Sequence, residues 1–172
     1  SPYTKYIKER LKDYLAHRVR FPVFDLSDKV LEVYYNKFRD KDYAYLNGYT
    51  SSLVAFADFI IRTGRDPLKS ICPTLKVCIA TSEMCTAEDR KVLEDGFGVK
   101  VINEYGAAEL DILAIEDEKG NWVLNEENLY IEVVNEDDEP VGDGEEGRIL
   151  VTSLYNKAMP FIRYELGDLG AI

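Results

Sequence analysis

The sequence predicts an α/β fold in which helices flank a mainly parallel sheet, followed by a β-rich antiparallel portion. Three observations support this prediction. Helical periodicity dominates the start of the chain, a strand-helix-strand pattern covers residues 75–103, and short strands separated by turns fill the remainder. We therefore divide the chain into an α/β portion, residues 1–109, and a β-rich portion, residues 110–172.

Four helices are predicted in the first portion, at residues 3–17, 28–39, 53–61 and 87–94. Side chains that accept hydrogen bonds from free helical N–H groups precede three of them, namely Ser27, Thr50 or Ser51, and Thr86. Asp89 follows Thr86 by three residues, which is the spacing of a capping box. Glycine ends two helices, Gly64 after the third and Gly96 with Gly98 after the fourth.

Two short apolar runs, Leu75–Ala80 and Val99–Asn103, lie on either side of the fourth helix and have the character of buried strands. A β-α-β unit makes its two strands parallel and crosses over with a right hand. The loops Thr81–Glu83 and Glu104–Glu109 then lie at the same edge of the sheet. Because open α/β sheets bind ligands at the carboxyl ends of their strands, we expect the functional site there.

After residue 110 the pattern changes to strands joined by turns. The predicted strands span residues 112–115, 122–124, 129–134 and 148–154, and turn-forming sequences separate them at 118–121 and 139–142. Strands that follow one another so closely are typical of an antiparallel sheet or a partial barrel.

The composition excludes several classes of function. The formal net charge of -11 disfavours nucleic-acid binding, because phosphates would be repelled. No run approaches the roughly 18 uninterrupted apolar residues of a membrane span, since Asp58 interrupts Leu53–Ile61. The polar N-terminus, residues 1–12, lacks a secretory signal. We expect a cytoplasmic chain that binds neither nucleic acid nor membrane.

Several features that suggest chemistry have simpler explanations. Gly142–Gly147 has the spacing of a dinucleotide-binding loop, but it contains three carboxylates and precedes a strand rather than a helix, so we predict a turn. His17, the single histidine, lies near the end of the first predicted helix beside arginines and is interpreted as a charged helix terminus. The acidic stretch 109–146 lacks the register of a calcium loop and is interpreted as a solvated surface.

The three cysteines fit neither a disulfide framework nor a zinc site, because they are odd in number and six and seven residues apart. We predict reduced core thiols at Cys72, Cys78 and Cys85.

Asn103–Glu109, with the sequence N-E-Y-G-A-A-E, combines an aromatic residue, a glycine and a carboxylate where a strand ends. A tyrosine ring can stack on a nucleobase, which is worth about 1–3 kcal/mol. A carboxylate can hold the magnesium that accompanies a nucleotide. Taken alone, such a tyrosine is more often a core or rim residue and such a glutamate a helix-start acid, so these residues leave both interpretations open.

Two motifs together are more specific. Asn103–Glu109 resembles the N-x-Y-G-x-[ST]-E motif of the adenylate-forming superfamily, the acyl- and aryl-CoA synthetases and their relatives. Tyr164–Asp168 resembles the later Y-[RK]-T-G-D motif of that superfamily. Three further segments are similar to its phenylacetate-CoA ligase branch, which includes capsular-polysaccharide-biosynthesis relatives: Asn47–Ser52, Gly142–Leu154 and Ala158–Tyr164. The likeness covers essentially the whole chain.

The resemblance implies roles for residues that match the family motifs. Tyr105 would stack on adenine, Asp168 would accept hydrogen bonds from the ribose hydroxyls, and Glu109 would coordinate magnesium. The other residues implied at the nucleotide are Thr81, Ser82, Glu83, Glu104 and Gly106. Gly106 and Ala107 would border the carboxylate substrate. No catalytic residue is assigned within the chain.

The activity that the resemblance implies is activation of a carboxylic acid with ATP and magnesium to an acyl adenylate, followed by acyl transfer to CoA or another acceptor. The phosphate loop and the lysine-bearing C-terminal domain of the family are not found in the 172 residues. We therefore interpret the chain as an internal segment that folds but does not catalyse ATP-pyrophosphate exchange by itself.

Two departures from the motifs favour an alternative. Ala108 replaces a hydroxyl residue and Glu165 replaces a basic one. With the acidic face, they leave open a degenerate, non-catalytic binding or interaction domain.

Overall fold

The computed structural model describes residues 2–171, without the side chains of residues 2, 3, 5 and 6. The Tyr3 and Tyr6 side chains of the first predicted helix therefore lie outside the described residues. The helices are α1 (Pro2–Leu15), α2 (Asp28–Asp40), α3 (Thr50–Arg62), α4 (Leu68–Ile71) and α5 (Ala87–Phe97). The strands are β1 (Tyr45–Tyr49), β2 (Val77–Thr81), β3 (Lys100–Ala107), β4 (Asp111–Glu116), β5 (Trp122–Leu124), β6 (Leu129–Val134), β7 (Gly147–Ser153) and β8 (Tyr164–Gly170).

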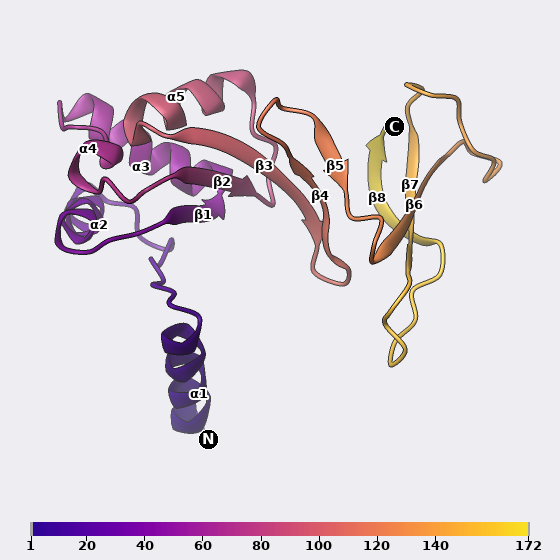
Figure 1. Ribbon diagram of the computed structural model, residues 1–172, viewed down its shortest axis with the longest axis horizontal. Helices are drawn as coiled ribbons and strands as arrows, with labels where there is room; N and C mark the ends of the chain where they lie inside the picture. The colour runs from indigo at the N-terminus through magenta and orange to yellow at the C-terminus, as the bar shows by residue number, and fades with distance from the viewer. Residues whose placement is uncertain (1, 172) are drawn as a thin grey trace.

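The strands form two sheets, which lie side by side in Figure 1. Sheet A has the order β1-β2-β3-β4-β5, with β1 to β3 parallel and β4 and β5 antiparallel. Sheet B is antiparallel, in the order β6-β7-β8. The predicted fold class is confirmed. Strand direction changes after β3, near residue 109, but the sheet itself changes only after β5.

Two strands were not anticipated. The sequence of β1, Y-L-N-G-Y, is short and contains a glycine, and β8 contains two glycines, so neither has a strong strand signal. Neighbouring strands pair with them, which shows that tertiary context overrides the weak local preference.

Helices α3 and α5 lie on one face of sheet A and pack against each other (Figure 1). The predicted end of the fourth helix at Glu94 is wrong, because α5 continues through Gly96 to Phe97. Gly96 serves close packing instead: a Cβ at this position would lie 2.8 Å from both Cα and Cβ of Ala57 in α3. Gly98, with φ of 70°, ends the helix in the left-handed conformation that favours glycine.

Gly96→Ala is expected to destabilise the chain by about 1–3 kcal/mol, because the added methyl group meets backbone atoms that cannot move aside. Urea unfolding followed by circular dichroism measures the change. Gly48→Ala is the matched control, since its Cβ would make ordinary contacts, 3.5 Å from the Leu53 side chain. Equal midpoints for the two variants would show that the α3-α5 approach is not tight.

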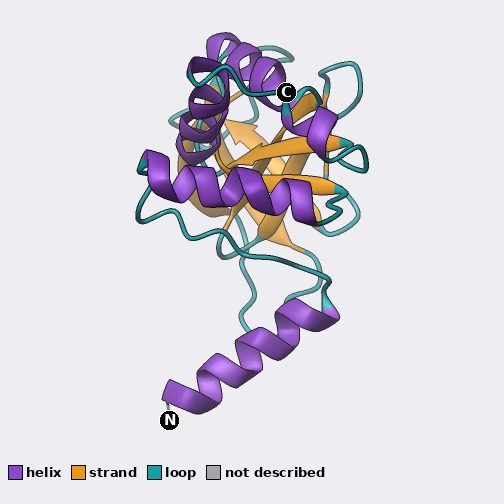
Figure 2. Ribbon diagram, turned by 90° about the vertical axis from the view of Figure 1, so that its left-hand side faces the viewer, coloured by secondary structure: helices purple, strands orange, loops and turns teal. Residues whose placement is uncertain are grey.

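Two hydrophobic cores hold the chain together. The first lies among α2 to α5 and strands β1 to β3, with Phe38, Phe59 and Phe97 fully buried. The second joins Leu110 and Leu113 of the β3-β4 hairpin to Leu129, Ile149 and Val151 of sheet B. Sheet B is therefore packed against sheet A through this second core. Helix α1 stands away from the body (Figure 2).

The remaining local predictions have mixed outcomes. Thr86 and Asp89 form the predicted capping box, and Gly142–Gly147 leads through a turn into β7. Ser27 is an N-cap by position but makes no side-chain capping bond. The prediction that Thr50 or Ser51 caps α3 is wrong, because α3 begins at Thr50 and its N-cap position is Tyr49.

The predicted thiols are confirmed as free cysteines, with Cys72 and Cys78 buried and Cys85 half-buried. Among the described residues, no helix is long and apolar enough to cross a membrane.

Candidate nucleoside site

The parallel pairing of β1, β2 and β3 ends at one level, as predicted for the carboxyl edge of the sheet. Tyr49 of β1 is in register with Thr81 of β2, and Thr81 with Glu104 of β3. Thr81 Oγ1 donates a hydrogen bond of 3.0 Å to Glu104 Oε1, which links two of these ends. The segments that follow, including Ser82–Cys85 and Tyr105–Gly106, therefore lie at one edge.

Glu104–Ala107 lies in strand β3 rather than in the predicted loop, because β4 returns antiparallel and pairs with it. The register shifts between Tyr105 and Gly106, a β-bulge that re-aims neighbouring side chains. A Cβ on Gly106 would lie 2.8 Å from the Asp111 carbonyl oxygen. Glycine is thus required here by the close approach of the hairpin backbone.

Asp168 comes from the other sheet, on strand β8. The pairing of β7 with β8 is also irregular: Leu150 pairs with Glu165, whereas Arg148 pairs with Leu169. Gly167, with φ of 85°, lies inside this irregular stretch, immediately before Asp168. The glycine of the second motif therefore permits the bend from which Asp168 reaches sheet A.

Tyr105 and Asp168 meet across the gap between the sheets. The Tyr105 hydroxyl donates a hydrogen bond of 2.7 Å to Asp168 Oδ2. Burial of the half-exposed tyrosine, followed by the hydrogen bond and the negative charge of Asp168, raises the pKa of Tyr105 well above its usual value. The phenol is therefore a neutral donor at physiological pH.

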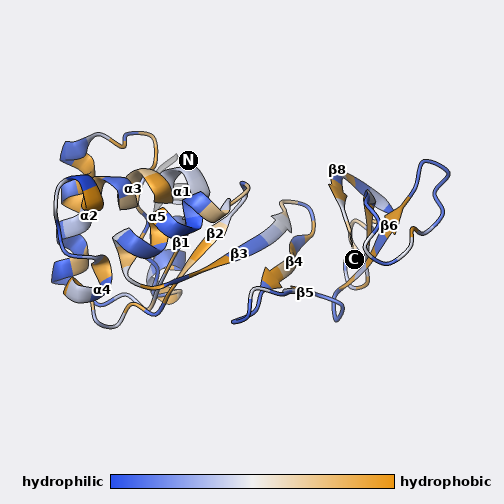
Figure 3. Ribbon diagram, turned by 90° about the horizontal axis from the view of Figure 1, so that it is seen from above, coloured by the Kyte–Doolittle hydropathy of each residue, from blue (hydrophilic) through white to orange (hydrophobic). Residues whose placement is uncertain are grey.

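A cavity of about 670 Å³ lies at this junction. Its walls come from both sheets and from the loop after β2. The lining residues are Ser82, Glu83, Met84, Cys85, Asn103, Glu104, Tyr105, Gly106, Leu113, Ala114, Trp122, Leu124, Ile131, Val133, Ile149, Asp168, Leu169, Gly170 and Ala171. One wall is largely apolar, whereas the residues near Tyr105 carry carboxylates. Figure 3 shows sheet A with its helices and sheet B as two parts of the molecule, one on each side of this junction.

Asp168→Asn is expected to lower the pKa of Tyr105 toward its usual value of 10, because the amide still accepts the phenol proton but carries no charge. The ring carbon shift of labelled Tyr105 against pH measures this, and Glu165→Gln is the control, since Glu165 pairs with Arg148. Because the pKa of Tyr105 is higher in the folded chain than in the unfolded chain, its contribution to the free energy of unfolding is complete below pH 10. This contribution is lost as pH rises above 10. An unchanged Tyr105 titration in Asp168→Asn would contradict the contact.

Three of the predicted site residues do not line the cavity. Thr81 contacts Glu104, as described above, and Ala107 packs against the second core. Glu109 is exposed in the turn between β3 and β4. Of the three side chains on which the predicted site depends most, the structure brings together Tyr105 and Asp168 but not Glu109. Within residues 2–171 no group of three potential metal-ligating side chains is found.

A buried ion pair beside the site was missed by the sequence analysis. Glu116 of β4 lies 2.6 Å from Arg90 of α5, and its side chain is only 9% exposed. The backbone N–H of Asn103 donates to the same carboxylate at 2.8 Å. Glu116 therefore holds α5 and β3 in place beside Tyr105. The only sequence signal was a charged residue at the end of an apolar strand, which is equally typical of a solvated position.

Comparison with known proteins identifies the class of fold first. The chain is similar in structure to 2-hydroxyisobutyryl-CoA ligase in complex with 2-HIB-AMP and CoA, with a TM-score of 0.75 and 19% identity, covering 90% of this chain and 33% of that one. The chain therefore has the fold of the matching third of this CoA ligase. No family model matches the sequence.

The sequence is similar to curated phenylacetate-coenzyme A ligases. The chain is 34% identical over 104 residues to phenylacetate-coenzyme A ligase of Escherichia coli (strain K12), which is 56% of this chain and 23% of that enzyme. It is 29% identical over 164 residues to phenylacetate-coenzyme A ligase of Pseudomonas putida, which is 91% of this chain and 36% of that enzyme. The predicted resemblance to the phenylacetate-CoA ligase branch is confirmed, and the chain spans well under half the length of these relatives.

Proposed function

We propose that the chain supplies the nucleoside-binding part of an ATP-dependent ligase that activates a carboxylic acid as an acyl adenylate and transfers the acyl group to CoA. The contact between Tyr105 and Asp168 across the cavity carries this proposal. It joins an aromatic ring and a carboxylate, the two groups that would recognise a base and a ribose. The names of the sequence relatives support the same reaction class.

The charges around the cavity favour a nucleoside over a phosphate chain. Glu83, Glu104 and Asp168 are among the lining residues, and no lysine or arginine is among the described ones. Carboxylates accept hydrogen bonds from ribose hydroxyls but repel phosphates. The cavity would therefore hold the base and ribose, with the phosphates directed away from these acids.

Individual residues would act as follows. The Tyr105 ring would stack on adenine, while Asp168 keeps Oδ1 available for a ribose hydroxyl because Tyr105 occupies Oδ2. Gly106 and Ala107 would border the carboxylate substrate. Magnesium is bound through one or two carboxylates plus substrate phosphates, so the exposed Glu109 fits a single ligand to it. When bound, the ion would offset phosphate charge during acyl-adenylate formation.

Titration of the chain with AMP, followed by two-dimensional NMR, tests the proposal. We expect saturable shifts at Tyr105, Trp122 and Gly167, with weak affinity because phosphate-binding cations are not among the lining residues. The chain by itself is expected to show no ATP-pyrophosphate exchange. No shift in a folded sample would overturn the nucleoside site and favour the degenerate binding domain.

A further inference from the structure

Glu83 lines the cavity, but its carboxylate is engaged on the side of helix α3. The backbone N–H of Ser51 donates to Glu83 Oε2 at 2.7 Å, and the Ser51 hydroxyl donates to Oε1 at 3.0 Å. The hydroxyl of Thr50, which is buried, donates to the Glu83 carbonyl oxygen at 3.2 Å. Both carboxylate oxygens and the backbone of Glu83 are therefore tied to the first turn of α3.

These contacts replace a cap that α3 lacks. The first N–H groups of a helix have no intrahelical partner, and the N-cap residue Tyr49 makes no side-chain capping bond. A carboxylate at this position also interacts favourably with the positive end of the helix dipole. The α3 N-terminus is thus completed by a residue from a loop more than 30 positions later in the sequence.

The loop that contains Glu83 has an unfavourable backbone conformation at Ser82. Ser82 has φ of 66°, a left-handed conformation that is unfavourable for a residue with a side chain. Such conformations persist where the surrounding contacts hold them. The four residues of this loop, Ser82–Cys85, all line the cavity beside Tyr105. Anchoring Glu83 therefore fixes one wall of the site.

We propose that Glu83 is a positioning residue: its carboxylate fastens the cavity wall Ser82–Cys85 to the first turn of α3 and does not itself bind the nucleotide. This inference rests on the proposed function for the identity of the ligand. It assigns the loop Thr81–Glu83 a mechanical role, and it gives Thr50 and Ser51 a part in shaping the site although neither lines the cavity.

Three single variants and one double variant separate positioning from direct binding. Glu83→Ala removes both acceptors and is expected to weaken AMP binding about tenfold, the loss of a charge-assisted hydrogen bond. Glu83→Gln retains an acceptor for the Ser51 N–H and a donor for its hydroxyl, so its affinity should stay within about threefold of the original. Ser51→Ala should weaken binding by a smaller factor, and adding it to Glu83→Ala should cause little further loss.

Hydrogen exchange of the Ser51 amide is the second measurement, and it needs no nucleotide. We expect exchange to accelerate about tenfold or more in Glu83→Ala and to remain slow in Glu83→Gln. Unchanged exchange in Glu83→Ala would overturn the proposal, as would equal loss of AMP affinity in Glu83→Gln and Glu83→Ala with Ser51→Ala unaffected. If the unaltered chain fails to bind AMP, the nucleoside site itself is refuted, and the exchange data alone decide whether Glu83 anchors the loop.

Discussion

Replacing Tyr105 by alanine is expected to weaken AMP binding about tenfold or more, because base-aromatic stacking contributes about 1–3 kcal/mol. The same change removes the hydroxyl that bridges to Asp168. Tyr105→Phe separates these contributions, since it keeps the ring and removes only the bridge. We expect Tyr105→Phe to retain most of the affinity. Isothermal titration calorimetry with AMP measures all three proteins.

Two controls make this comparison decisive. Tyr130→Ala removes a tyrosine that is 60% exposed and does not line the cavity, so its affinity for AMP should be unchanged. Circular dichroism of each variant shows whether the fold is retained. If folded Tyr105→Phe loses as much affinity for AMP as Tyr105→Ala, the affinity depends on the hydrogen bond to Asp168. The ring then does not stack on the base.

Replacing Glu116 by alanine is expected to lower the free energy of unfolding by about 2–3 kcal/mol, because it removes the carboxylate to which Arg90 Nη2 and the Asn103 N–H donate. The value is below that of a fully buried pair because the Arg90 side chain is 27% exposed. Glu116→Gln should lose less, since its amide oxygen still accepts from Asn103. Urea unfolding followed by far-ultraviolet circular dichroism measures these differences.

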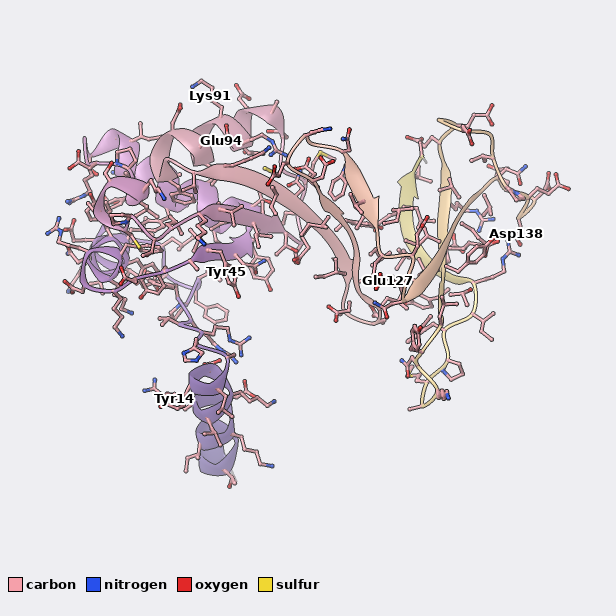
Figure 4. All side chains as sticks on the ribbon, in the orientation of Figure 1. Tyr14, Tyr45, Lys91, Glu94, Glu127 and Asp138 are labelled. Atoms are coloured by element: carbon pink, nitrogen blue, oxygen red, sulfur yellow. The ribbon has the colours of Figure 1, made fainter. Side chains whose placement is uncertain are left out.

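Glu127→Ala is the matched control. Glu127 is exposed between β5 and β6 (Figure 4), and exposed substitutions of this kind change stability by less than about 0.5 kcal/mol. Equal stabilities of the Glu116→Ala and Glu127→Ala variants would mean that the ion pair does not hold α5 against sheet A. A loss confined to Glu116→Ala would support its structural role beside the site.

The elements with strong local signals were predictable from the sequence. The capping box at Thr86 and Asp89 and the apolar runs that became β2 and β3 depend on nearby residues alone. Strands β1 and β8 were not predictable, because their glycines weaken the strand pattern and only pairing partners distant in sequence define them. The end of α5 was misplaced because the reason for Gly96 lies on α3.

The candidate site follows the same division. Motif residues placed Tyr105 and Asp168 in one site, and the structure brings their side chains together. The sequence did not reveal that Glu83 contacts α3 or that Glu116 accepts from Asn103. Each contact joins two elements that come close only in the folded structure. The apolar wall that includes Trp122 and Ile131 was also missed, since such residues have the same pattern in any half-buried strand.

The cavity has one wall on each sheet, and this division links ligand binding to the cohesion of the whole chain. A molecule bound between Tyr105 and Asp168 would hold together two sheets that otherwise meet through the small second core and the Tyr105–Asp168 hydrogen bond. Binding of such a molecule would raise the melting temperature of both sheets, because the complete binding surface exists only when the two sheets are packed together. Separation of the two sheets would therefore also release the bound molecule.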